Sequence, residues 1–183
     1  MLHTNTETAD SRKITAYGED PMEGKCIKDS CVTISYVMLP EDANPAGNVH
    51  GGVIMKHIDM TGGVVAMRHS RSNVVTASID SLIFHYPVFI GDLITLKASL
   101  NMVARSSMEV GVRVETENLF TGEVRHTASA YLTFVALDRN GRPCRVPPLT
   151  LETEEDQRRN RQAAARREIR LAEKNKKAAE SKK

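Results

Sequence analysis

The segment that decides the fold is HGGVIMKHIDMTGGVVAMRH, which runs from His50 to His69. It is too long for a strand, and its apolar residues are spread around several faces of a helix. This pattern predicts a buried helix. Gly62 and Gly63 would each cost about 1 kcal/mol relative to alanine inside such a helix, so we expect another backbone to pack closely against them in compensation.

Segments on both sides of this helix have the features of strands, because most of them alternate between apolar and polar residues or are rich in Val, Ile and Thr. One precedes the helix and four follow it: Cys31 to Leu39, Asn73 to Phe84, Ile94 to Met102, Met108 to Val114 and Val124 to Phe134. A single apolar helix has to be covered. This order therefore favours an α+β domain with an antiparallel sheet curled around the helix.

The chain divides into three parts. Its 183 residues, of which 40% are hydrophobic, suit one domain with a sizeable core. Residues 1–27 show no clear hydrophobic period and are expected to form a loose leader, whereas residues 28–150 should form the domain. Residues 151–183 form the tail, in which the stretch from Thr153 onward contains no Pro or Gly and has only Ile169 and Leu171 as large apolar residues. We expect this charged tail to be an exposed, fraying helix or disordered.

Charge and cysteine content limit the classes of partner. The net charge of +2 is too small to indicate a polyanion partner, and the basic tail lacks aromatic residues and a regular apolar stripe. The first residues are polar, and no apolar run approaches the length of a membrane span. The three cysteines form no CxxC pair, which favours reduced thiols. These features predict a cytoplasmic protein without a nucleic-acid or membrane partner.

The densest group of unusual residues lies around the predicted start of the helix. If the helix begins near His50, the backbone N–H groups of Gly51 and Gly52 lie at its positive end, where they can bind an anion or a developing oxyanion. Asp59 follows within an otherwise apolar helix, where a carboxylate is unfavourable unless it is paired or faces a cleft. The alternatives are that Asp59 lies on a solvated face, that His50 only starts the helix, and that the glycines serve packing.

The sequence does not support a metal site or a serine triad. His50 and His57 are about 10.5 Å apart along one helix, too far to share a metal ion without further ligands. The sequence contains no GxSxG, HExxH, Walker or GxGxxG motif. A metal site and a serine triad are therefore not expected.

Three stretches in series resemble the acyl-CoA thioesterase branch of the hotdog superfamily: NPAGNVHGGVIMKHIDMTGGVVAMRH from Asn44, NVVTASIDSLIFHYPVFIGD from Asn73 and RSSMEVGVRVETEN from Arg105. The resemblance covers roughly residues 28–150. It implies the hotdog fold, a long helix wrapped by a five-stranded antiparallel sheet. It also implies dimers that join two domains edge to edge, commonly as trimers of dimers, that is, hexamers.

The resemblance assigns roles to individual residues. Asp59 matches the catalytic carboxylate of the family, Asn44 its assisting asparagine and Thr76 the hydroxyl residue that helps to place the water. Gly51 matches the glycine whose N–H binds the thioester carbonyl, and His50 lies next to it. The expected contacts with coenzyme A (CoA), from a basic and hydroxyl-rich turn, are made by Arg105, Ser106 and Ser107.

The implied reaction is hydrolysis of acyl-CoA to a fatty acid and CoA, with no metal or redox cofactor. Asp59 either removes a proton from water or attacks the carbonyl to form a mixed anhydride, and both routes stay open. Gly51 and Asp59 are about 12 Å apart along one helix, so we expect each site to combine residues of two subunits.

Two other functions fit the sequence less well. An enoyl-CoA hydratase would need a pattern such as DxNPxH, but the chain reads DANPAG from Asp42 to Gly47 and lacks the histidine. A non-catalytic acyl-CoA-binding regulator would need a DNA-binding module, for which the leader is too short. Both alternatives are therefore less favoured than hydrolysis.

Overall fold

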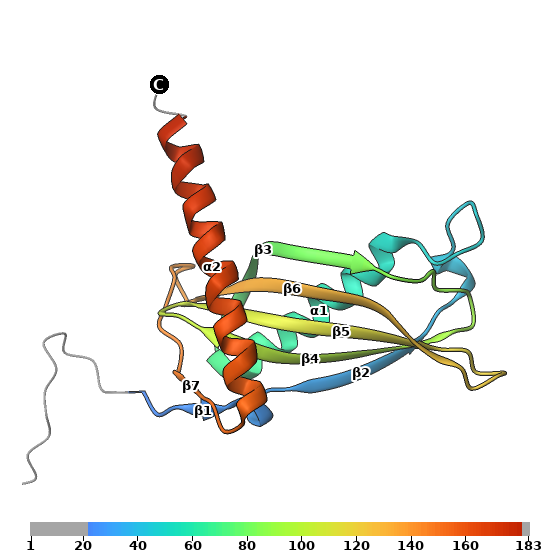
Figure 1. Ribbon diagram of the computed structural model, residues 1–183, viewed down its shortest axis with the longest axis horizontal. Helices are drawn as coiled ribbons and strands as arrows, with labels where there is room; N and C mark the ends of the chain where they lie inside the picture. Colours follow the sequence, from blue (N-terminus) through green and yellow to red (C-terminus); the bar gives the residue numbers. More distant parts are fainter. Residues whose placement is uncertain (1–21, 181–183) are drawn as a thin grey trace, which may run out of the picture.

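A computed structural model describes residues 22–180 of the chain. Two helices and seven strands follow one another as shown in Figure 1. Their bounds are β1 Lys25–Cys26, β2 Val32–Val37, α1 Gly51–Ser70, β3 Asn73–Phe84, β4 Leu93–Val103, β5 Ser107–Glu117, β6 Val124–Leu137, β7 Leu149–Thr150 and α2 Glu154–Glu180, with short 3-10 helices at Ile27–Asp29 and Pro40–Asp42. The predicted helix and the strands after it lie where the sequence placed them.

The main sheet has five antiparallel strands in the order β2-β4-β5-β6-β3. Its inner face packs against α1, and alternate residues of β4, β5 and β6 enter the shared core, including Leu96, Leu100, Val110 and Leu132. The intervening residues point to the opposite face because strand side chains alternate. The expected α+β fold, a long helix against a five-stranded antiparallel sheet, is confirmed.

The close approach at Gly62 involves a side chain rather than another backbone. A Cβ atom added there would lie 3.0 Å from Cε2 of Phe134, a buried ring on β6, whereas one at Gly63 would lie 3.8 Å from the same ring. The expectation of backbone contact was therefore wrong. An aromatic ring fills the space that the missing Cβ leaves, because a flat ring can lie closer to the helix than a second backbone with its own side chains.

The start of the domain differs slightly from the expected boundary. Lys25 and Cys26 form β1, which pairs in parallel with Leu149 and Thr150 of β7. The last residues of the expected leader thus belong to the folded unit. The rest of the leader, residues 1–21, lies outside the described residues.

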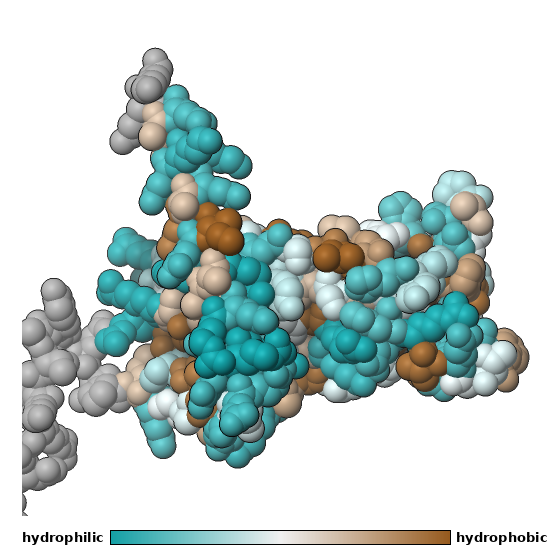
Figure 2. All heavy atoms as spheres, viewed as in Figure 1, coloured by the Kyte–Doolittle hydropathy of each residue, from teal (hydrophilic) through white to brown (hydrophobic). Residues whose placement is uncertain are grey.

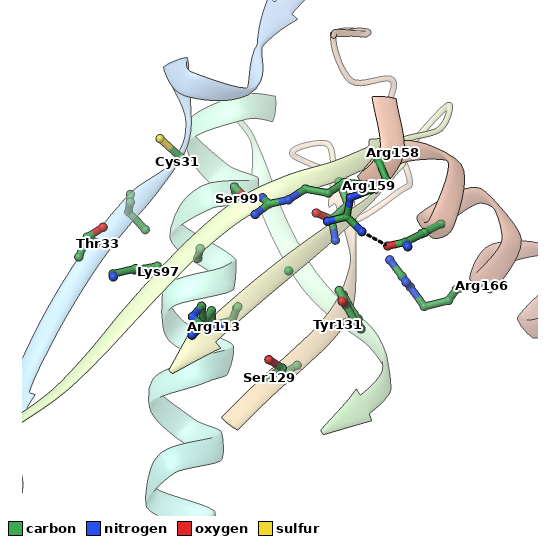
Figure 3. Close-up of a pocket in the computed structure, with 17 residues that line it drawn as sticks. Cys31, Thr33, Lys97, Ser99, Arg113, Ser129, Tyr131, Arg158, Arg159 and Arg166 are labelled. Carbon is green, nitrogen blue, oxygen red and sulfur yellow. Dashed lines mark hydrogen bonds between the residues drawn. The ribbon is translucent and has the colours of Figure 1, made fainter. Parts of the chain in front are cut away.

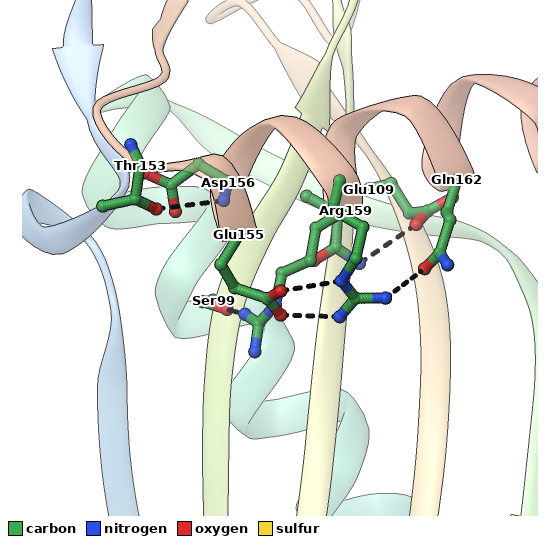
Figure 4. A network of polar contacts seen from close by, with 9 residues as sticks. Ser99, Glu109, Thr153, Glu155, Asp156, Arg159 and Gln162 are labelled. Atoms are coloured by element: carbon green, nitrogen blue, oxygen red, sulfur yellow. Dashed lines mark hydrogen bonds and ion pairs between the residues drawn. The ribbon is translucent and has the colours of Figure 1, made fainter.

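The charged tail forms a helix, α2, which is one of the two expected alternatives, but its first half packs on the sheet instead of being solvated. It begins with a capping box, in which Thr153 N–H donates to the Asp156 carboxylate and Asp156 N–H to the Thr153 hydroxyl (Figure 4). Its first half then crosses the outer face of the sheet, where Ala163 is fully buried. Residues 171–180 are exposed and project beyond the sheet (Figure 1).

Polar contacts attach α2 to several strands in turn. Arg159 donates to Ser99 on β4, and Arg166 pairs with Glu109 on β5. Arg170 pairs with Asp80 on β3. Because these contacts are polar, α2 docks on the sheet without an apolar stripe that the sequence could reveal. The side of α2 that is visible in Figure 2 is mostly hydrophilic as well. Among the described helices, none is long and apolar enough to cross a membrane.

Candidate active site

Asp59 and Thr76 form one part of the candidate site. Asp59 lies half-buried in the middle of α1, and its Oδ1 accepts a hydrogen bond of 2.5 Å from the Thr76 hydroxyl on β3. The pairing of β3 with β6 shifts register between Thr76 and Ser78, so Ala77 is an extra residue in the strand. Such a bulge changes where the neighbouring side chains point. Asp59 is thus paired with a hydroxyl group instead of lying on a fully solvated face.

The start of α1 forms the second part. The N–H of Gly52 donates to Nδ1 of His50 at 3.0 Å, so His50 is the N-cap of the helix. No partner for the N–H of Gly51 is found among residues 22–180. The nearest atom to a Cβ built on Gly51 would be Cζ of Phe84 at 3.9 Å, so the space is open. One donor at the positive end of the helix is therefore available to an incoming oxygen.

Asn44 lies in the loop that leads into α1, and its side chain is oriented by the backbone. Its Oδ1 accepts from the N–H groups of Ala46 at 2.9 Å and Asn48 at 3.2 Å. Since the carbonyl oxygen of the side chain is occupied, the amide NH₂ is the group that can donate outward. Asn44 and Gly51 line the same cavity, of about 350 Å³.

Within one chain, the expected catalytic residues therefore lie in two separate groups. Asn44, His50 and Gly51 lie together, and Asp59 and Thr76 lie together. Asp59 does not line the cavity at Asn44 and Gly51, because about 12 Å of helix separates Gly51 from Asp59.

The expected CoA contacts lie at the β4–β5 turn, at the end of the sheet nearest β7 (Figure 1). Arg105 and Ser106 line a cavity of about 600 Å³, and Ser107 is the first residue of β5. Arg145 lines this cavity too, and it also shares a second one of about 780 Å³ with Arg105. Sequence reasoning missed Arg145. Two arginines forty residues apart become neighbours only in the fold.

The histidines of α1 are not grouped for metal binding. The His57 ring packs on Tyr36, with 4.1 Å between ring centroids, and burial lowers the pKa of His57. No group of three or more His, Cys, Asp or Glu residues that could hold a metal ion occurs among residues 22–180.

Comparisons with known proteins agree with this architecture. The family model of the thioesterase superfamily matches residues 46–120. YkhA of Bacillus subtilis, named an uncharacterized acyl-CoA thioester hydrolase, is 42% identical over 134 residues, which are 73% of this chain and 78% of YkhA.

Solved structures are similar as well. An apo hexameric acyl-CoA thioesterase is 38% identical with a TM-score of 0.79, covering 83% of this chain and 97% of that one. The acyl-CoA hydrolase of Staphylococcus aureus, solved with butyryl-CoA and CoA, is 33% identical with a TM-score of 0.78, covering 85% and 94%. Variants of the staphylococcal enzyme with an asparagine, an aspartate or a threonine replaced by alanine have been solved too. The protein described here belongs to the acyl-CoA thioester hydrolase family, and its fold is the hotdog fold.

Proposed function

We propose that this protein hydrolyses acyl-CoA thioesters to a fatty acid and CoA at sites that two chains build together. Family membership supports the reaction. The observation that supports a site shared between two chains is that the candidate catalytic residues lie apart within one chain. Asn44 and Gly51 are at the start of α1, whereas Asp59 is at its middle, where it pairs with Thr76 of β3. The oxyanion donor and the attacking group must both lie about 3 Å from one reacting centre.

The alanine variants of the staphylococcal hydrolase support these roles. Its substituted asparagine and aspartate lie 15 residues apart, and its aspartate and threonine lie 17 apart. Asn44, Asp59 and Thr76 have the same two spacings.

In the proposed mechanism, the Gly51 N–H polarises the thioester carbonyl and stabilises the charge that grows on its oxygen, a contribution typically of about 10²- to 10³-fold. Thr76 already donates its proton to Asp59, so its oxygen is left to accept from a water, while the Asn44 amide can donate to that water. Asp59 then acts as general base, or as a nucleophile that forms a mixed anhydride. Neither route requires a metal or redox cofactor.

The proposed dimer joins two chains along β3 around a two-fold axis. β3 is an edge strand of the sheet, so one side of its backbone is open to pairing. Val75, Ile79 and Ile83 on β3 are exposed although apolar, as is Met60 beside Asp59. A two-fold axis there brings the start of each α1 near the middle of the other. We further propose a trimer of such dimers, which is supported by the similarity to two thioesterases whose structures are named hexameric.

We propose that Arg105, with Arg145, binds the phosphates of CoA, because guanidinium groups match phosphate oxygens. If this contact is present in both the ground and transition states, Arg105→Ala should raise KM for acyl-CoA much more than it lowers kcat. Steady-state kinetics at low salt measures both. Equal KM values for Arg105→Ala and the parent would contradict the assignment.

We place the protein in the cytoplasm, because its three cysteines are free and Cys31 is exposed, as suits a reducing compartment. No nucleic acid or membrane partner is proposed.

The decisive experiment is complementation between Asn44→Ala and Asp59→Ala chains. Asp59→Asn or →Ala alone should lower kcat by about 10² to 10⁴. When the two single variants are co-expressed in equal amounts, about half of the dimers are mixed, and each mixed dimer has one intact site, so roughly a quarter of all sites should be active. CoA release, followed with a thiol reagent, gives the readout.

A matched control uses both substitutions in one chain, mixed with the parent chain. If sites are shared, the mixed dimers of this control have no intact site, and only parent dimers are active. Mixed dimers of the single variants that show no gain over either variant would place Asn44 and Asp59 in one subunit. No CoA release by the parent from acyl-CoAs of any chain length would overturn the enzymatic function.

A further inference from the structure

A cavity lies on the outer face of the sheet, and the proposed reaction does not use it. It has a volume of about 440 Å³ and lies between α2 and strands β2, β4, β5 and β6 (Figure 3). We call it the outer cavity. It is on the face that α2 crosses, whereas α1 and Asp59 lie on the inner face. The sheet therefore separates the two sites.

The lining of the outer cavity is strongly cationic. Five lining side chains carry a positive charge and no carboxylate lines it: the cations are Lys97, Arg113, Arg158, Arg159 and Arg166. Hydroxyl groups, including those of Ser129 and Tyr131, line it beside them (Figure 3). The whole chain has a net charge of only +2, so this concentration of cations is a local feature.

The carboxylates next to the outer cavity do not balance its cations. On the strands, Lys97 and Arg113 are directly opposite each other in the β4–β5 pairing, where like charges repel. Both pair with the same carboxylate, Glu115, at 2.6 and 2.8 Å. One positive charge is therefore left over on this side.

The helix side repeats this arrangement. Arg158 and Arg159 both pair with Glu155, at 2.6 and 2.9 Å, as Figure 4 shows for Glu155 and its neighbours. Arg166 pairs with Glu109 one to one. Three carboxylates thus pair with five cations. The outer cavity keeps an excess of two positive charges, which matches the charge of one phosphate dianion.

We propose that the outer cavity binds a phosphate-bearing small anion, separately from the site of thioester hydrolysis. Guanidinium groups present paired N–H donors that fit phosphate oxygens. The volume lies within the range of small-molecule sites, roughly 300 to 1,000 Å³. The cations come from α2 on one side and from the sheet on the other, so a bound anion also joins α2 to the sheet and stabilises the fold by mass action.

Isothermal titration calorimetry of the full chain with sodium tripolyphosphate and with ATP, at low salt, tests this proposal. The expected result is one site per chain. Lys97→Gln with Arg113→Gln should weaken binding by about tenfold or more, since two of five charges are lost. Lys174→Gln with Lys177→Gln removes the same charge from the exposed end of α2 and should leave binding unchanged. Both variants should hydrolyse acyl-CoA normally, because neither pair lies in the proposed active site.

Tighter binding of ATP than of tripolyphosphate would assign a nucleotide, and equal affinities a phosphate chain; either result supports the proposal. Absence of binding to the parent would overturn it, as would equal losses in the two double variants. Tripolyphosphate binding that Arg105→Ala weakens and that Lys97→Gln with Arg113→Gln leaves unchanged would place the anion in the CoA site, which also overturns it. These readouts measure binding, so they are independent of whether the proposed hydrolysis is correct.

Discussion

The buried ion pair between Arg166 and Glu109 should be the contact that most stabilises the docking of α2. The Glu109 side chain is fully buried, and Arg166 donates to it at 2.6 and 3.3 Å. Asn101 also donates to it, at 3.1 Å. The Arg166 guanidinium lies 3.8 Å from the centroid of the Tyr131 ring, which adds a cation–π contact. Arg166→Met keeps an unbranched apolar stem and removes the guanidinium group with its charge and donors.

The expected loss of stability follows from these surroundings. Removing one partner of a buried pair typically costs about 3 to 5 kcal/mol. Arg166 is 24% exposed, and Asn101 still donates to Glu109 in the variant, so we expect a smaller loss of about 2 to 4 kcal/mol. Urea unfolding at fixed protein concentration, followed by far-ultraviolet circular dichroism, measures it.

Two further variants make this prediction refutable. Arg161→Met, on an exposed position of the same helix, should change stability by less than about 0.5 kcal/mol. Glu109→Leu combined with Arg166→Met removes both charges, and it should be more stable than Arg166→Met alone by about 1 kcal/mol or more. If Arg166→Met costs no more than Arg161→Met, or if Glu109→Leu brings no recovery, the pair does not hold α2 in place.

Three other substitutions test the packing of α1 and its acid sensitivity. Gly62→Ala should destabilise the fold by about 1 to 3 kcal/mol, because its Cβ would press on the buried Phe134 ring at 3.0 Å. Gly63→Ala places its Cβ 3.8 Å from the same ring and should stabilise the fold by up to about 1 kcal/mol. Thermal unfolding that ranks the two variants in the opposite order would contradict this. Burial lowers the pKa of His69, which contacts the Pro147 carbonyl at 2.8 Å. Between this lowered value and the unfolded pKa of about 6.5, the unfolded state binds more protons, so stability should fall as the pH falls from 7 to 5. His69→Gln should show a smaller fall in urea midpoint over that range, and an equal fall would exclude His69 as its source.

Much of the fold could be predicted because its signals are local. Apolar residues alternate with others along β4, β5 and β6 because one face of these strands packs in the core. The apolar run at Gly51–Ser70 is long because α1 is buried under the sheet. The position of Asp59 within that run identified it as a candidate before its partner was known. The sequence also allows His50 to be a residue that only starts the helix, and the structure shows its ring accepting from the Gly52 N–H as the N-cap.

The contacts between distant segments were decided by the tertiary structure alone. The hydrogen bond from Thr76 to Asp59 depends on a bulge in β3, and no local pattern encodes a shift of register between two strands. The pairs that anchor α2 join residues up to 90 positions apart and are polar on both sides, so α2 has the composition of a solvated helix. Hydrophobic periodicity reports which residues leave water along one element. It carries no information about which charged groups meet across the chain, because that depends on where the folded backbone places them.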